Sequence, residues 1–544
     1  EVSLPHWLDD LGLPEELKER VRAAGLAQMV FKAPTKGLSL HLGFDYAGEH
    51  KMGPLSIAMF KAKQAGGLAV QAALSVARIR TMDGGKRDVA LVIPGPSLHG
   101  KSTLTISLDF EGSEASKLLA LPQDPDEGVY PMNDDIVLLR PLAEPVVVER
   151  QGRSMRITHS IDGTEDNFYA VPFGLTREDD PLTYDVVRGA PGAPNSQETM
   201  ENVPVDVDSG IPNTLENPVR NMRMILSRSR LVEHKGVGRV LEAISGGGLT
   251  NSVHVPMEAM DGIFWQGVMR QSTVIPPLVR LTRESYVRAL MFGEAVRTGA
   301  ASGAIGQPYI EYFSDPFIIG LEDENANAMH ALLQTMEEGG MPQYYSMFNT
   351  GGIGADSNDA ATGARYRKIP RELTLLLQES LLRGALKFEH DPLLGADVAV
   401  AVVNGRGEEV VDLRQEWLPR NVYGEEEYAR RVLEMKRKRY YGENAADRAG
   451  ILRYTKATVA IMDLADIPAP QDERELAWLF SFVWSLDRAY DTVAETAASL
   501  AQGQPPSSDA LQGLHSMYEA ARSGGLRLPV AGDEALRTLG VTPP

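Results

Sequence analysis

Residues 95–102 read Gly95-Pro96-Ser97-Leu98-His99-Gly100-Lys101-Ser102 and match the pattern G-x-x-x-x-G-K-[ST] in full. The compact apolar run from Asp88 to Ile93 precedes this stretch and is typical of a buried strand. Residues 103–108 follow it and are compatible with a helix. A strand, a glycine-rich turn and a helix in this order predict a phosphate-binding loop. The alternative is a glycine-rich turn that precedes Lys-Ser by chance.

Each residue type in this loop has a physical role in holding a triphosphate. Glycines let backbone N–H groups turn inward around the β- and γ-phosphates, and the N-terminus of the following helix adds partial positive charge. Lys101 supplies a mobile cation, and the hydroxyl of Ser102 can bind Mg²⁺. We therefore expect nucleotide contacts from eight loop residues, namely Gly95, Ser97, Leu98, His99, Gly100, Lys101, Ser102 and Thr103.

A metal-bound triphosphate also needs an acidic partner, usually at the end of a neighbouring strand. Asp134 and Asp135 stand directly before the apolar run 136–139, about thirty residues after the loop. We expect Ser102 and Asp135 to hold the metal, and Asp134 to orient its water or the acceptor. The alternative for an Asp-Asp pair is a solvated turn.

Histidine is the next residue type to consider as a base or ligand. His99 lies inside the loop, where it could approach the γ-phosphate or a substrate hydroxyl, and the alternative is a loop residue that faces solvent. His50 follows Glu49 and could join the same cleft or serve as a structural histidine. No two histidines stand at the helical spacing that a zinc site needs, so the sequence does not indicate zinc.

Composition excludes several classes of protein. The formal net charge of -20 argues against nucleic-acid binding, which needs clustered Lys and Arg. The sequence contains no cysteine, which excludes disulfides, thiolate metal sites and cysteine nucleophiles. It has neither a secretory signal pattern at residues 1–13 nor an apolar run of the roughly 20 residues that span a bilayer. We therefore expect a soluble, cytoplasmic protein that binds neither nucleic acid nor membrane.

The 544 residues are too many for one compact core, so two or three domains are expected. Short apolar runs alternate with Gly, Pro and Asn clusters and occasional helices up to residue 442, which predicts a mixed α/β body over residues 46–442. Residues 1–45 form a short N-terminal segment. Residues 443–544 read as a helical extension with a linker near 503–508. This extension could bind a protein partner or mediate self-association through residues 445–544.

Further short motifs occur in the same order as in a known enzyme family. The segment Tyr46-Ala47-Gly48-Glu49-His50-Lys51-Met52-Gly53 resembles Y-G-G-E-x-K-K-G, the loop resembles G-x-S-G-T-G-K-T, and Asp134-Asp135 is similar to D-D-E-H. Other matching stretches are Met200-Glu201-Asn202-Val203, Leu215-Glu216-Asn217, Ile275-Pro276-Pro277 with Arg280-Leu281-Thr282, Asn349-Thr350-Gly351-Gly352 and Leu418-Pro419-Arg420-Asn421. The collinear set resembles the phosphoenolpyruvate carboxykinase family, closer to its ATP-type branch.

The resemblance implies a phosphoenolpyruvate-carboxykinase-like nucleotide-binding fold and makes Lys51 a candidate for a cation that faces phosphate. In the family, Mn²⁺ is held at positions that here read Met52, Gln71 and Asp135, so two of three ligands are replaced. The family's Y-A-K motif reads Tyr169-Ala170-Val171, and its G-T-E-R-G motif reads Gly299-Ala300-Ala301-Ser302-Gly303. Most of the family's N-terminal domain has no counterpart in residues 1–45.

Three functions are compatible with these residues. The first is an ATP- and Mg²⁺-dependent phosphotransferase that acts on an unidentified small molecule or protein group. Its catalytic candidates are Lys51, His99, Lys101, Asp134 and Asp135, and Mn²⁺ is an alternative to Mg²⁺. The second is phosphoenolpyruvate carboxykinase activity through a rearranged site, and the third is a nucleotide-binding interaction module without turnover. New cations for an acceptor could come from Arg220, Arg223, Arg365, Arg367 and Lys368, for each of which surface solvation is the alternative.

Overall fold

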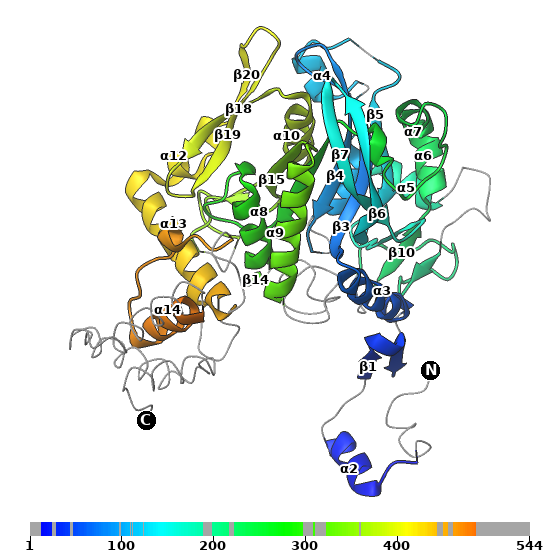
Figure 1. Cartoon of the computed structure of the whole chain (residues 1–544), viewed down its shortest axis with the longest axis vertical. Coiled ribbons are helices and arrows are strands. Elements are labelled where there is room, and N and C mark those ends of the chain that lie inside the picture. Colours follow the sequence, from blue (N-terminus) through cyan, green and yellow to red (C-terminus); the bar gives the residue numbers. More distant parts are fainter. Residues whose placement is uncertain are drawn as a thin grey trace.

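A computed structural model of the chain describes residues 12–23, 29–43, 47–96, 100–108, 110, 112–122, 124–188, 199–216, 222–296, 308–310, 322–357, 361–442, 450–454 and 461–485. Its body is an 11-stranded mixed sheet covered by helices (Figure 1), which confirms the mixed α/β architecture expected from the sequence. The main path of this sheet runs β18 (Leu386–Asp391), β19 (Ala396–Val403), β12 (Leu278–Leu281), β15 (Gln343–Asn349), β11 (Gly262–Met269), β4 (Lys86–Pro94), β3 (Leu68–Arg80), β6 (Ile136–Arg150) and β7 (Arg153–Gly163). Off this path, β20 (Glu409–Asp412) pairs with β19 and β5 (Gly128–Asn133) pairs with β3.

The centre of the sheet is parallel, whereas its flanks are antiparallel. β11 pairs in parallel with β4 on one side, where Phe264 lies opposite Leu91, and with β15 on the other, where Val268 lies opposite Phe348. Strands that run in one direction end at the same edge of a sheet. The phosphate loop after β4 therefore lies beside the segments that follow β11 and β15.

The side chains on the two faces of β4 pack into two different parts of the core. Ala90 and Val92 pack into the cluster that contains Trp265, whereas Leu91 and Ile93 point to the opposite face. This alternation follows from the two-residue period of a strand. Both faces are apolar because both are covered by other parts of the core.

Helices cover both faces of the sheet. Residues of α7 (Gly238–Ile244), α8 (Arg283–Phe292) and α9 (Glu322–Glu338) belong to the cluster on the Trp265 face, whereas α10 (Arg371–Arg383) packs with η2 (Thr103–Ser107) on the other. The remaining helical segments are α2 (Glu15–Ala23), η1 (Pro34–Lys36), α3 (Ala47–Gln64), α4 (Glu114–Leu118), α5 (Pro181–Arg188), α6 (Arg228–Lys235), η3 (Met257–Ala259), α11 (Arg414–Trp417), α12 (Pro419–Tyr423), α13 (Glu425–Tyr441), η4 (Ile451–Arg453), η5 (Leu464–Asp466) and α14 (Glu473–Ser485).

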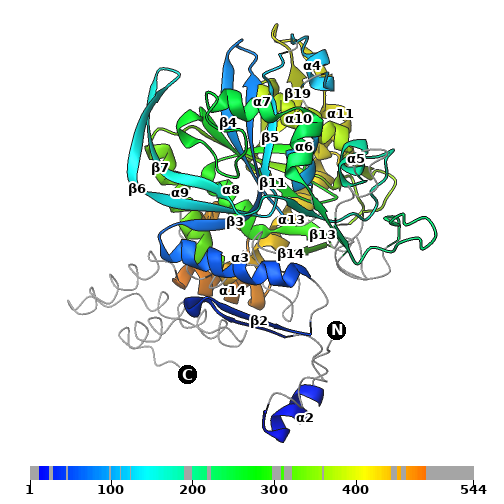
Figure 2. The same ribbon diagram turned by 90° about the vertical axis from the view of Figure 1, so that its right-hand side faces the viewer.

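Smaller sheets and a long hairpin surround this body. The hairpin of β6 and β7 extends outward from the sheet, and α3 runs across its base beside the β2 strand (Figure 2). The short strands pair as β1 (Met29–Ala33) with β2 (Leu38–Leu42), β8 (Phe168–Ala170) and β9 (Met200–Glu201) with β10 (Arg223–Leu226), β13 (Glu294–Val296) with β14 (Pro308–Ile310), and β16 (Gly352–Ile353) with β17 (Arg367–Lys368). Among the residues described, none of the helices combines the length and apolar character needed to cross a bilayer.

The structure places a helix where the sequence suggests only turns. Gly48 and Gly53 make residues 46–53 resemble a loop, yet α3 begins at Ala47 and continues through Pro54. Packing of this helix against β3, β6 and β2 overrides the weak local propensity. Gly53 also permits a close approach, because an added Cβ would lie 2.5 Å from Nε2 of His41.

The C-terminal extension is described only in part. α14 is a helix within residues 461–485, while the expected linker at 503–508 and most of the residues expected to contact a partner lie outside the described residues. The basic run in α13 forms ion pairs, for example Arg430 with Glu434 and Arg439 with Glu294. These ion pairs give basic residues of α13 acidic partners.

The buried guanidinium of Arg383 links α10 to the sheet. We expect its removal to destabilise the folded protein strongly. Its Nη1 donates to the carbonyl oxygen of Arg80 at 2.9 Å and to Glu127 at 3.0 Å, and its Nε donates to Glu379 at 2.7 Å. Arg383→Met leaves two buried carboxylates without their cation. We expect the free energy of unfolding, measured by chemical denaturation, to fall by about 3–5 kcal/mol.

Arg280→Met is the matched control, because Arg280 is 53% exposed and pairs with Asp397 at the surface. Its loss should cost less than about 1 kcal/mol. Equal effects of the two substitutions would contradict the structural role of Arg383.

Candidate functional site

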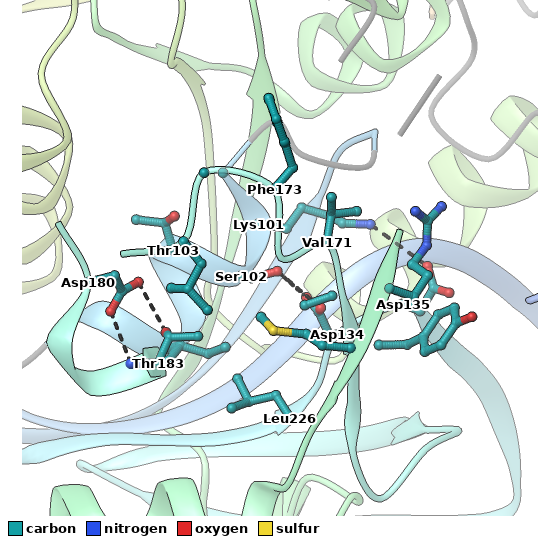
Figure 3. A pocket seen from close by; sticks show the side chains of 18 of the residues that line it. Lys101, Ser102, Thr103, Asp134, Asp135, Val171, Phe173, Asp180, Thr183 and Leu226 are labelled. Atoms are coloured by element: carbon teal, nitrogen blue, oxygen red, sulfur yellow. Dashed lines mark hydrogen bonds and ion pairs between the residues drawn. The ribbon is translucent and has the colours of Figure 1, made fainter. Parts of the chain in front are cut away.

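The described residues of the loop that the sequence predicts to bind phosphate lie beside a cavity of about 470 Å³ at the end of β4. The loop contributes its second half, α3 and β3 contribute one wall, and residues 169–183 with β10 contribute the other. Figure 3 shows Lys101 extending toward Asp135 and Ser102 pointing at Asp134, with Asp180 and Thr183 on the opposite side. The lining residues are Gly48, Lys51, Met52, Gln71, Gly100, Lys101, Ser102, Thr103, Ile106, Ser107, Asp134, Asp135, Tyr169, Ala170, Val171, Phe173, Gly174, Leu175, Asp179, Asp180, Thr183, Arg223, Met224, Leu226, Arg270 and Arg371.

Two loop positions require glycine. A Cβ added to Gly95 would lie 3.0 Å from the carbonyl oxygen of Val268 in β11. Gly100 has a φ of 108°, and its Cβ would lie 3.2 Å from the Thr350 side chain. Side chains at these positions would push the loop away from β11. Gly95 itself lies outside the cavity lining, and the predicted contacts Ser97, Leu98 and His99 lie outside the described residues.

Lys101 is buried at the floor of the cavity, with 5% of the residue exposed. Its Nζ lies 4.0 Å from Oδ1 of Asp135 and, within the part of the chain that the structure describes, forms no hydrogen bond. Burial lowers its pKa, although the nearby carboxylates oppose this shift. An ammonium in this state is suited to bind an anion that enters the cavity.

The Ser102 hydroxyl lies 3.0 Å from both carboxylate oxygens of Asp134. Asp134 is 7% exposed, and burial raises its pKa to about 6 even though Lys101 opposes the shift. A hydroxyl and a carboxylate supply hard oxygen ligands of the kind that Mg²⁺ prefers. The structure thus brings Asp134 to Ser102, where the sequence suggested Asp135.

Asp135 is instead engaged by two lysines. Nζ of Lys51 lies 2.6 Å from Oδ2 of Asp135 and 3.0 Å from Oε1 of Glu165. Burial opposes ionisation of Asp135, but Lys51 and Lys101 hold its pKa below the ordinary value. Burial also raises the pKa of Glu165 to about 7, with Asp135 adding to this shift and Lys51 opposing it.

The replaced positions of the family's metal site line the same cavity. Met52 and Gln71 are these positions, and Val171, at the lysine position of the Y-A-K motif, lines the cavity as well. Among the described residues, no group of three or more His, Asp or Glu side chains has a geometry that would hold a metal. Mg²⁺ needs fewer protein ligands, because phosphate oxygens and water complete its shell. The donors present therefore fit Mg²⁺ bound together with a nucleotide.

The other end of the cavity is partly apolar. Ile106 and Leu226 line it, and Figure 3 shows Phe173 above Val171, which lies beside Lys101. Arg371 closes this end, since Nη2 donates to the Ser107 hydroxyl at 2.6 Å and lies 3.5 Å from Asp180. Apolar walls with a few fixed polar groups are typical of a small-molecule site.

The remaining candidate residues from the sequence differ in whether they line the cavity. His50 is exposed and outside the cavity lining, with its ring 5.5 Å from that of His41. Arg223 lines the cavity, its guanidinium 5.9 Å from the centre of the Tyr169 ring. The three basic residues at 365–368 lie outside the lining, and Arg365 pairs with Glu427 at 2.8 Å. Arg220 lies outside the described residues.

Sequence reasoning overlooked two residues of this region, Glu165 and Arg270. Glu165 lies in the segment after β7, and Arg270 directly follows the apolar strand β11. Neither belongs to a recognisable motif. Their positions at the ends of strands beside the phosphate loop were the one available signal.

Comparison of the chain with models of protein families and with curated proteins finds no match.

The elevated pKa of Asp134 leads us to expect that removing its charge stabilises the folded protein. Its pKa is about 6 in the folded protein and near 3.8 when unfolded, so its ionisation costs stability as the pH rises between these values. At pH 7, without nucleotide and in a chelator, we expect Asp134→Asn to raise the free energy of unfolding by about 2–3 kcal/mol. The gain should disappear near pH 4.

Asp124→Asn provides the control of opposite sign. Burial opposes ionisation of Asp124, but hydrogen bonds from Lys86 and Arg80 lower its pKa to about 2, so this substitution should destabilise the protein at pH 7. A gain for Asp134→Asn that does not change with pH would contradict the assignment.

Proposed function

We propose that the chain is an ATP- and Mg²⁺-dependent phosphotransferase on a phosphoenolpyruvate-carboxykinase-like scaffold. The observation that carries this proposal is the buried ammonium of Lys101, which shares one cavity with the Ser102 and Asp134 pair. A cation, a hydroxyl and a carboxylate at the exit of a strand are the groups that a magnesium-bound triphosphate requires.

The arrangement of distant segments supports the scaffold. Lys51, Gln71, Lys101 and Asp135 come from four separate places in the sequence, and all four line the cavity. They are the positions at which the chain resembles the carboxykinase motifs or departs from them. A chance set of short matches would not be expected to converge in this way.

The proposed reaction transfers the γ-phosphoryl group. An acceptor hydroxyl oxygen attacks the γ-phosphorus, the bond from that phosphorus to the β–γ bridging oxygen breaks, and ADP leaves with the electron pair. The proton of the hydroxyl passes to the Asp135 carboxylate, which Lys51 orients at 2.6 Å, and then to water. Lys101 holds the β- and γ-phosphates throughout.

Mg²⁺ would be held by Ser102 and Asp134, and when bound it neutralises negative charge on the phosphates. Such transfers depend on positioning and electrostatics more than on covalent chemistry by the protein. The side chains proposed to surround the phosphates therefore include the chemical groups that the reaction needs.

Decarboxylation of oxaloacetate is the less favoured reaction. Met52 stands at a metal-ligand position of the family and offers no charge, and Gln71 offers only a neutral amide. Loss of a metal that stabilises an enolate removes several kcal/mol of transition-state stabilisation. Gly95, Ser97, Gly100 and Lys101 match the family's phosphate loop, whereas the groups for the second substrate differ, which favours another acceptor.

Lys101→Met tests the phosphate site. Because charge-assisted hydrogen bonds to phosphate contribute roughly 1.5–3 kcal/mol, we expect ATP affinity, measured by calorimetry with Mg²⁺, to fall at least about tenfold. Lys117→Met is the control, since Lys117 is exposed in α4 and outside the cavity, and its affinity should equal that of the wild type. Unchanged affinity in Lys101→Met would refute the site.

Asp135→Asn tests turnover separately from binding. With γ-labelled ATP and a metabolite extract under single-turnover conditions, we expect label transfer to slow by about 100-fold or more, while ATP affinity changes less than about threefold. Asp397→Asn, at the surface pair with Arg280, should transfer at the wild-type rate.

Measurements of label transfer, carbon dioxide release and ATP binding together separate the three functions. Carbon dioxide release from oxaloacetate with ATP would instead indicate a carboxykinase. Tight ATP binding with neither reaction would indicate an interaction module.

A further inference from the structure

Arg270 stands at the end of β11, on the side of the sheet that holds the phosphate loop. Val268, two residues earlier, packs with Ile93 and with Leu104 of η2 on that side. Side chains two residues apart along a strand point to the same face. Arg270 therefore projects from beside the loop glycines, beyond the end of the strand, and lines the cavity.

The guanidinium of Arg270 lies near Tyr366 but forms no hydrogen bond and no ion pair among the described residues. Its Nε is buried without a hydrogen bond, and its side chain forms no ion pair there. Two other cations of the cavity have carboxylate partners, because Lys51 pairs with two carboxylates and Arg371 contacts Asp180. A guanidinium that is partly buried, with its buried Nε unpaired, is costly unless an anion is supplied to it.

The backbone around Arg270 is fixed even though its head group is unpaired. The N–H of Gln271 donates to Oδ1 of Asn349 at 3.0 Å, and the N–H of Thr350 donates to the carbonyl oxygen of Met269 at 2.9 Å. These bonds tie the segment after β11 to the segment after β15. A donor held in place before its ligand arrives loses little entropy on binding.

We propose that Arg270 binds the terminal phosphate of a nucleoside triphosphate in this cavity and so distinguishes triphosphate from diphosphate. The inference rests on the proposed function. Lys101 supplies one ammonium to the β- and γ-phosphates, and the terminal phosphate adds charge that Lys101 alone does not balance. The planar fork of an arginine matches two oxygens of one phosphate.

The test compares the affinities of MgATP and MgADP for the full chain by calorimetry. In Arg270→Met we expect ATP affinity to fall about ten- to a hundredfold, while ADP affinity changes less than about threefold. Arg270→Lys should keep part of the preference, because it keeps the charge and loses the fork. The retained ADP affinity shows in each variant that the cavity is folded.

Arg371→Met is the matched control, because it removes a cation from the opposite end of the cavity. Its ratio of ATP to ADP affinity should stay within about threefold of the wild type. Equal losses for both nucleotides in Arg270→Met, or no loss for either, would overturn the role of Arg270 while the proposed function stands. If the wild type binds neither nucleotide, the proposed function fails and this inference falls with it.

Discussion

The buried ammonium of Lys101 is the group on which the rest of the cavity depends. It lies 4.0 Å from Asp135, and burial removes most of its hydration. The fold keeps it there because Gly95 and Gly100 let the loop pack directly against β11 and Thr350. An anion that binds Lys101 therefore stabilises the folded protein as well as occupying the site.

The charges around this ammonium are unequally matched. Lys51 pairs with two carboxylates, and burial keeps the pKa of Asp134 elevated. The guanidinium of Arg270 lies in the same cavity without a carboxylate partner in the described residues. A magnesium-bound triphosphate would match these groups, because the metal would bind carboxylate and hydroxyl oxygens and the phosphates would bind the cations.

Local patterns predicted the strand 88–93, the acidic pair and the loop that faces it, because each depends on neighbours in the sequence. Tertiary packing determined the rest. The glycines near Lys51 suggested turns, yet packing on β3 formed a helix. Pairing of Ser102 with Asp134 depends on where β5 ends relative to β4. Glu165 and Arg270 reach the region through sheet topology, which no local motif encodes.

A crystal structure of the full chain with Mg²⁺ and a non-hydrolysable ATP analogue tests the central claim most directly. The account predicts density for the terminal phosphates within hydrogen-bond distance of Nζ of Lys101, with the metal between those phosphates and the Ser102 and Asp134 oxygens. A triphosphate bound elsewhere on the protein, or one whose phosphates point away from Lys101, would contradict it.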